Sequence, residues 1–258
     1  MKGAHSGMTA FVESVFKAID CEDSAFLQKT AADPENGKAI YDAVTEYSLV
    51  TKQKYLEKGL PLDVYSDTMA DIHIWADNFY REHGTEGLDE IGWIMNHLKL
   101  RLFAIGRLQF MPIRLRFPEN MTPTGAKVSL SEGCNVLDLH IPQGKPLSVE
   151  ACDASFSAAT KFFETHFPKT EFEGYTCHSW LLSQNLSAFL PESSNILAFG
   201  KRFTITHTDD SDPQAEERIF GGKFGSNTSS SLAVAAKKYI ENGGKIGAAF
   251  GVIETLYK

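Results

Sequence analysis

Candidate catalytic side chains gather in two short segments in which polar and apolar residues alternate. One segment carries His140, and the other carries Cys177, His178 and Ser179. Imidazole, thiol and hydroxyl groups are side chains that transfer protons or attack carbonyl carbons in enzymes. Because neighbouring residues of a strand point to opposite faces, Cys177 and His178 cannot pair directly as nucleophile and base. A cysteine hydrolase would therefore need His140 on the same face as Cys177.

The same residues also fit a structural interpretation. Cys177 would then be a small buried side chain, and His140 or His178 would be a hydrogen-bonded core histidine. No metal site is predicted, because Asp138, His140 and His178 lack the ligand spacings of zinc proteins. Proton transfer and core packing stay open as alternatives.

A second group of candidate residues is basic. Arginines cluster at positions 101, 107, 114 and 116 of an otherwise acidic chain, and guanidinium groups suit carboxylate or phosphate ligands. Since alternate residues of a strand share a face, Arg107 and Gln109 are expected to project together into a cleft. The alternative is an exposed strand face whose arginines pair with nearby acids. The glycine-rich segment from Gly221 to Ser226 lacks the order of a phosphate-binding loop and is expected to be a connector.

The first part of the chain is predicted to be helical. Apolar residues recur at helical spacing in residues 9–19, 40–58, 65–79 and 88–98. Ser66 or Asp67 is expected to cap the third of these helices, and Gly84 follows its end. Trp75 and Trp93 fall within the apolar patterns and are expected to fill the core.

From about residue 100 the pattern changes to strands that alternate with helices. Strands are expected at residues 102–117, 136–141, 175–182, 203–207 and 246–253. Helices are expected at residues 148–167 and 227–242, and residues 209–217 are expected to form an exposed loop. Ser148 is the expected N-cap of the first of these helices. This order predicts an α/β (α+β) protein, with a helical N-terminal domain at residues 1–98 and a mixed-sheet domain at residues 99–258.

Composition narrows the functional classes. A formal net charge of −8 opposes non-specific binding to nucleic acids or anionic membranes. The 4 cysteines are too few and too scattered for a disulfide framework, which favours a reducing compartment. We find no export signal and no apolar run near the ~20 residues that cross a bilayer. These features predict a cytoplasmic protein whose partners are proteins and small molecules.

Several motifs follow one another along the chain: Tyr65-Ser66-Asp67-Thr68-Met69 with Trp75, Ile105-Gly106-Arg107-Leu108-Gln109-Phe110, Leu139-His140-Ile141-Pro142, Cys177-His178-Ser179-Trp180-Leu181-Leu182 with Ser194-Asn195, and Gly243-Gly244-Lys245. Together they resemble the motifs of a bacterial family of acyltransferases. That family has a helical N-terminal domain and a C-terminal domain similar to the Gcn5-related N-acetyltransferases (GNAT). The resemblance covers about Tyr65 to Val252.

The resemblance implies an acyl-CoA-dependent N-acyltransferase that uses acetyl-CoA or another acyl-CoA and acts on a small amine or a peptide. The strand at residues 136–141 would part from its neighbour, and the acyl thioester would lie between them. His140 would act as general base, with Cys177 or Ser179 as the proton donor to the leaving thiolate. The cofactor-binding residues implied are Arg107, Gln109, Ile141, Gln143, Gly144, Lys145 and Ser148.

The sequence departs from the family pattern at the turn after this strand. The GNAT pyrophosphate signature, Gln/Arg-x-x-Gly-x-Gly/Ala, is absent there, and only Gly144 and Lys145 stand in its place. Pro142 and Pro146 also remove backbone N–H donors from the turn. This departure favours the alternative interpretation, a non-catalytic GNAT-like binding or partner-recognition module.

Overall fold

The computed structural model describes residues 9–221 and 229–257. The chain divides into two compact units, Met1–Ile105 and Gly106–Lys258. The first unit is built from helices, and the second contains most of a mixed sheet. The expected α/β (α+β) class, with helices first and a mixed sheet after them, is confirmed. None of the helices in the described ranges is long and apolar enough to cross a membrane.

The first unit contains helices α1 (Ala10–Cys21), α2 (Ser24–Ala31), α3 (Gly37–Glu57), α4 (Leu62–His83) and α5 (Ile91–Leu98), with the 3-10 helix η1 (Pro34–Asn36) before α3. The prediction missed α2, whose first turn is capped by the Asp23 carboxylate. It also placed the start of α4 too late. This helix begins after Pro61, so Ser66 lies in its first turns and donates to the Leu62 carbonyl instead of capping it.

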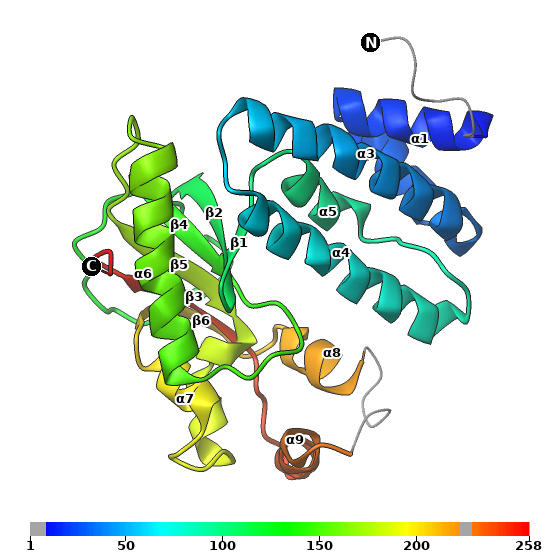
Figure 1. Cartoon of the computed structure of the whole chain (residues 1–258). Coiled ribbons are helices and arrows are strands. Elements are labelled where there is room, and N and C mark those ends of the chain that lie inside the picture. The colour runs from blue at the N-terminus through cyan, green and yellow to red at the C-terminus, as the bar shows by residue number, and fades with distance from the viewer. Residues whose placement is uncertain (1–8, 222–228, 258) are drawn as a thin grey trace. The chain divides into compact units, whose positions relative to one another are not determined.

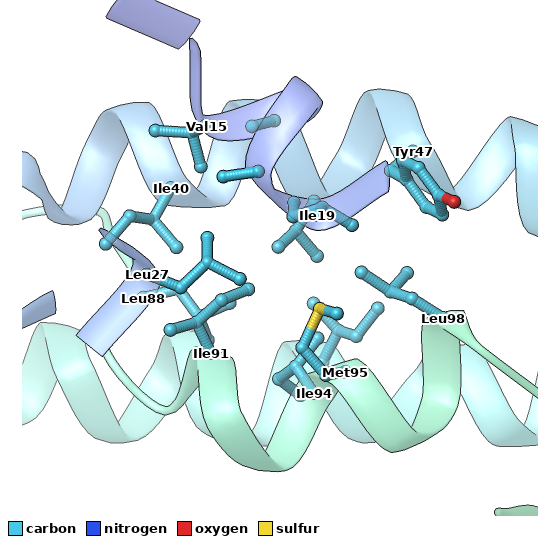
Figure 2. Close-up of a cluster of buried hydrophobic side chains, with 14 of the residues drawn as sticks. Val15, Ile19, Leu27, Ile40, Tyr47, Leu88, Ile91, Ile94, Met95 and Leu98 are labelled. Carbon is cyan, nitrogen blue, oxygen red and sulfur yellow. The ribbon is translucent and has the colours of Figure 1, made fainter. Parts of the chain in front are cut away.

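The apolar stripes of these helices meet in one core, which Figure 2 shows in close-up. Val15 and Ile19 of α1, Ile40 and Tyr47 of α3, and Leu98 of α5 are fully buried. Burial of apolar surface is the main force that holds such helices together, because each short helix is marginal alone. The 3.6-residue periodicity that predicted the helices is therefore the signature of this core.

The sheet contains seven strands in the order β1-β2-β4-β5-β7-β6-β3. Their bounds are β1 (Phe103–Ile105), β2 (Leu108–Arg114), β3 (Thr122–Pro123), β4 (Asn135–His140), β5 (Gly174–Ser179), β6 (Thr204–Asp209) and β7 (Ala248–Ile253). The β4–β5 pair is parallel, and β2–β4, β5–β7, β6–β7 and β3–β6 are antiparallel. The sheet is therefore mixed.

Helix α6 (Val149–His166) connects the two parallel strands and lies across one face of the sheet in Figure 1. The ring of Phe156 on this helix contacts Tyr175 of β5 at 4.9 Å and Phe110 of β2 at 6.2 Å between centroids. Ser148 caps α6, as predicted, and its hydroxyl accepts a hydrogen bond from the Ala151 N–H at 3.2 Å. Because successive side chains of a strand point to opposite faces, every second side chain of β2, β4 and β5 lies on the face away from α6.

The rest of the second unit consists of short helices. They are η2 (Trp180–Leu182), η3 (Gln184–Ala188), α7 (Asn195–Gly200), α8 (Gln214–Phe220) and α9 (Ser231–Glu241). Helices α8 and α9 share a small apolar core that includes Phe220 and Ala236.

Three predicted elements are wrong in extent. The single strand expected at residues 102–117 is two strands, because the backbone turns at Gly106 with a φ of 68°. The strand expected at residues 175–182 ends at Ser179, whose hydroxyl accepts a hydrogen bond from the Leu181 N–H and starts η2. The segment at residues 209–217 is the end of β6, a turn and the start of α8 instead of one exposed loop.

The close approach of β5 and β7 makes Gly174 a sensitive position. A Cβ atom there would lie 2.2 Å from the Ile253 carbonyl oxygen, so the backbone would have to shift. We expect Gly174→Ala to lower the free energy of unfolding by about 1–3 kcal/mol, measured by urea denaturation. The matched control is Gly92→Ala in α5, where nothing lies within 4 Å. That change is expected to be neutral or stabilising by up to about 1 kcal/mol. Equal effects of both changes would contradict this account.

Candidate active site

The strand register sorts the candidate side chains onto the two faces of the sheet. Gln109 of β2 lies opposite His140 of β4, and His178 of β5 lies opposite Phe250 of β7. Directly opposed residues of an antiparallel pair point to the same face. His140 and Asp138 therefore share the face away from α6, and the parallel register places Thr176 and His178 of β5 on that face too.

The ladder between β4 and β5 is short. Among the described residues the two strands pair only at Val136–Gly174, Leu137–Tyr175 and Asp138–Thr176. Strand β4 nevertheless runs on to His140, and β5 runs on to Ser179. A ladder continued in the same register would set His140 against His178. The strands instead diverge at this point, and the two histidines lie on either side of the divergence.

The imidazole of His140 lies beside an acidic side chain of its own strand. Its Nε2 atom lies 3.1 Å from Oδ2 of Asp138, two residues earlier on the same face. Oδ1 of Asp138 accepts a hydrogen bond of 2.7 Å from the Thr176 hydroxyl across the ladder. The His140 side chain is 28% exposed, so it is accessible to solvent while its carboxylate partner is fixed by β5. A carboxylate that orients an imidazole and stabilises its charged form is a common arrangement in general base catalysis.

His178 has a second carboxylate partner. Its Nε2 atom lies 3.3 Å from Oδ2 of Asp212, which belongs to the turn between β6 and α8. Oδ1 of Asp212 accepts a hydrogen bond of 2.8 Å from the Gln214 N–H at the start of α8. The divergence of β4 and β5 is thus bordered by two imidazole–carboxylate pairs, one on each strand.

Cys177 lies on the opposite face from the two histidines. It is fully buried on the α6 side of β5, next to Tyr175 and Ser179 in the alternation of the strand. Burial, and to a smaller degree the charge of Asp138, raises the pKa of the Cys177 thiol well above 9.0. The structure therefore does not bring Cys177 together with His140. Ser179 shares the face of Cys177, and its hydroxyl accepts a hydrogen bond from the Leu181 N–H.

The loop expected to bind the cofactor joins β4 to α6. Gln143, Gly144 and Lys145 are exposed, and Ile141, directly after the last residue of β4, is half-buried. Gly144 adopts a φ of 115°, and a Cβ atom built there would have nothing within 4 Å. The loop leads to Ser148, where the first turn of α6 presents backbone N–H groups and the positive end of the helix dipole.

Arg107 and Gln109 are placed differently. Arg107 lies in the turn before β2, and its Nε donates a hydrogen bond of 3.1 Å to the Pro146 carbonyl in the β4–α6 loop. This bond uses one of the five N–H donors of the guanidinium group. Burial lowers the pKa of Arg107, although the nearby Cys152 acts in the opposite direction. Gln109 is almost fully buried beside His140. Arg107 thus contacts the β4–α6 loop, whereas Gln109 lies opposite His140 on the neighbouring strand.

Sequence patterns did not reveal the partner of His178. Asp212 falls in a segment that was expected to be an exposed loop, and no spacing rule relates the two residues. In the described part of the chain, no three His, Cys, Asp or Glu side chains form a group that could hold a metal ion. The glycine-rich segment singled out in the sequence lies outside the described residues beyond Gly221.

Comparison with known families agrees with this architecture. Residues 102–253 match the model of the GNAT-like C-terminal domain, and residues 10–100 match that of the N-acyltransferase N-terminal domain. The chain belongs to this N-acyltransferase family. The boundary between the two matched regions falls where the chain changes from helices to the sheet. No curated protein sequence matches this family member closely enough to count as a relative.

Solved structures of similar fold are acyltransferases. One, in complex with decanoyl-CoA and teicoplanin, has a TM-score of 0.74 and 22% sequence identity, over 96% of this chain and 76% of the other. A second, in complex with CoA and 10C-teicoplanin, has a TM-score of 0.73 and 22% identity, over 95% of this chain and 76% of the other. At this level of identity the likeness establishes the shared fold of this N-acyltransferase family member.

Proposed function

We propose that this protein is an acyl-CoA-dependent N-acyltransferase whose acceptor is a primary amine on a small molecule or a peptide-like compound. The observation that carries the proposal is the divergence of β4 and β5 immediately after Asp138 and Thr176, with the His140–Asp138 pair beside it. An acyl thioester placed between the strands would lie next to an imidazole that can accept a proton. Family membership and the ligands of the similar structures support the same chemistry.

The β4–α6 loop and the start of α6 have groups that suit the phosphates of coenzyme A. The first turn of α6 offers backbone N–H donors and a favourable dipole, and a helix N-terminus is a common place for phosphate. Lys145 and Arg107 add positive charge at the same loop. Similar acyltransferases hold decanoyl-CoA and octanoyl-CoA, so a medium-length acyl chain is the donor that we propose to test first.

The proposed reaction forms a C–N bond and breaks a C–S bond. The acceptor nitrogen attacks the thioester carbonyl carbon, and His140 accepts the proton that this nitrogen loses. Asp138 holds the imidazole in place and stabilises its charged form. The C–S bond then breaks, and the leaving sulfur takes a proton from the imidazolium. Cys177 has no part in this scheme, because its thiol is buried on the other face of β5.

The alternative function is a binding module that has kept the fold without the reaction. Pro142 and Pro146 lack N–H donors in the loop where a GNAT enzyme would bind pyrophosphate, and this favours the module. The enzyme and the binding module differ in whether they transfer the acyl group. Binding of acyl-CoA is therefore measured first, and acyl transfer second.

Stability with ligand is the first measurement. Decanoyl-CoA at about 100 times its Kd is expected to raise the free energy of unfolding by about 2.7 kcal/mol, because it binds only the folded chain. Acetyl-CoA is the short-chain comparison, and decanoate without CoA is the control for non-specific binding of the acyl chain. Stability unchanged by every acyl-CoA would contradict the proposed function.

Transfer is then followed by CoA thiol release from decanoyl-CoA, with teicoplanin and simple primary amines as acceptors. Release that depends on the amine supports the enzyme. Binding without any amine-dependent release supports the binding module.

A further inference from the structure

The His178–Asp212 pair has no role in the scheme above, although it borders the same divergence of strands. Its imidazole shares the sheet face of His140, and its carboxylate comes from a different part of the chain. The His178 side chain is 44% exposed, against 28% for His140. The site therefore contains two imidazole–carboxylate pairs that differ in their access to solvent.

Amide formation from an alkyl amine requires two deprotonations of the nitrogen. An alkyl amine resembles the lysine side chain, with a pKa near 10.4, so it is almost fully protonated at neutral pH. One proton must leave before the lone pair can attack. A second proton leaves as the C–N bond forms. The leaving sulfur takes one of these protons, and the other is released to solvent, so that an ammonium ion and a thioester give an amide, a thiol and a proton.

We propose, on the basis of the proposed function, that His178 accepts the first proton from the incoming ammonium group, and that Asp212 positions its imidazole for this step. His140 then handles the second proton, which it passes to the sulfur. The division follows from access to solvent, because the first proton must leave the protein and the second must stay beside the thioester. The more exposed imidazole suits the first transfer, and the less exposed one suits the second.

The charged groups around His178 favour this assignment. Asp212 contacts its Nε2 atom, and Asp209, the last residue of β6, lies close enough for its charge to interact with His178. Ser211 hydrogen bonds, and to a smaller degree the charge of His178, lower the pKa of Asp209. From the other side, the strand β7 presents Phe250 opposite His178, which is an uncharged neighbour. The carboxylates of Asp212 and Asp209 attract a cationic acceptor and stabilise the imidazolium that forms.

The test compares two surrogate acceptors with decanoyl-CoA as donor. Ethylamine is protonated at pH 7, whereas hydroxylamine is largely neutral there and does not need the first deprotonation. CoA thiol release is measured for the wild type, His178→Asn and Asp212→Asn. We expect the ratio of ethylamine turnover to hydroxylamine turnover to fall about 10²-fold in both variants, the lower end of the range for a positioned general base. The ethylamine deficit is expected to narrow at pH 9, where more of the amine is already neutral.

Two controls separate this role from loss of charge or of structure. Asp210→Asn removes the same charge from the same turn, where Asp210 accepts a hydrogen bond from Asn185 instead of contacting His178. His73→Asn changes an exposed histidine in α4 of the other unit. Both controls are expected to keep the wild-type ratio. Thermal denaturation shows whether each variant is folded.

The outcomes distinguish the two proposals. If His178→Asn keeps the wild-type ratio of ethylamine to hydroxylamine turnover, whether or not both turnovers fall, the role of His178 is overturned. The acyltransferase function then still stands. A wild-type protein that transfers the decanoyl group to none of ethylamine, hydroxylamine and teicoplanin overturns the proposed function, and the role of His178 with it.

Discussion

Replacing His140 with glutamine is expected to lower the turnover number for decanoyl transfer by about 10²- to 10⁴-fold. Positioned general bases contribute factors of this size, and glutamine keeps the hydrogen-bonding ability of the side chain while removing its proton transfer. The KM for decanoyl-CoA is expected to change little, because the proposed CoA contacts belong to the β4–α6 loop and the start of α6. Steady-state CoA release with a fixed amine concentration measures both constants.

The matched control for this variant is His166→Gln. His166 ends α6, at the opposite end of that helix from Ser148, and its ring contacts Phe162. Turnover in this control is expected to stay within about 2-fold of the wild type, since changes away from special features have small effects. Wild-type turnover in His140→Gln would remove His140 from the mechanism and would favour the structural interpretation of the residue.

Replacing Asp71 with alanine is expected to destabilise the helical unit by about 3–5 kcal/mol. Asp71 is buried in α4, and its Oδ2 atom lies 3.0 Å from Nε2 of the fully buried His97. The same oxygen accepts hydrogen bonds from the indole N–H groups of Trp75 at 3.0 Å and Trp93 at 3.1 Å. Without the Asp71 carboxylate, its buried polar partners would have neither a hydrogen-bond acceptor nor access to water. This loss explains the large decrease expected in the free energy of unfolding.

The pH dependence of this effect has a definite sign. Burial alone would raise the pKa of Asp71, but the hydrogen bonds and charge of His97, with the indole N–H groups, hold it below its ordinary value of 3.8. A carboxylate with a lowered pKa stabilises the folded state fully above its unfolded value and loses this contribution as the pH falls through its folded value. The difference between the wild type and Asp71→Ala is therefore expected to be full above about pH 5 and to shrink below pH 4.

The control is Asp67→Ala, an exposed acidic residue of the same helix. Urea denaturation is expected to place this variant within about 0.5 kcal/mol of the wild type. Equal stability of Asp71→Ala and Asp67→Ala would mean that the buried carboxylate does not hold the helical unit together.

Local sequence patterns predicted the elements that follow one regular period. The stripe of Val15 and Ile19 in α1 and the alternation of Leu137 and Leu139 in β4 each report one buried face. Ser148 was found as a cap because a capping hydroxyl acts on residues next to it. Such features depend on residues that are close together in the chain, and they can therefore be predicted from the sequence.

The wrong or missing predictions concern features that depend on contacts between residues far apart in the sequence. The turn at Gly106 interrupts an apolar segment without changing its composition, and the Ser155 hydroxyl of α6 accepts a hydrogen bond from the Arg107 N–H that follows it. Trp75 and Trp93 were predicted to fill the core, and they do pack against it, but their shared bond to Asp71 was not foreseen. These contacts join segments whose proximity exists only in the folded chain.

The prolines of the β4–α6 loop affect more than the number of donors. Each proline ring fixes its own φ, so Pro142 and Pro146 restrict the backbone on both sides of Gly144 even before folding. A loop with fewer conformations to lose gives up less entropy when a ligand orders it. The residual freedom is concentrated at Gly144, whose positive φ only glycine adopts readily. Rigidity at this loop can therefore compensate in part for the phosphate donors that its sequence lacks.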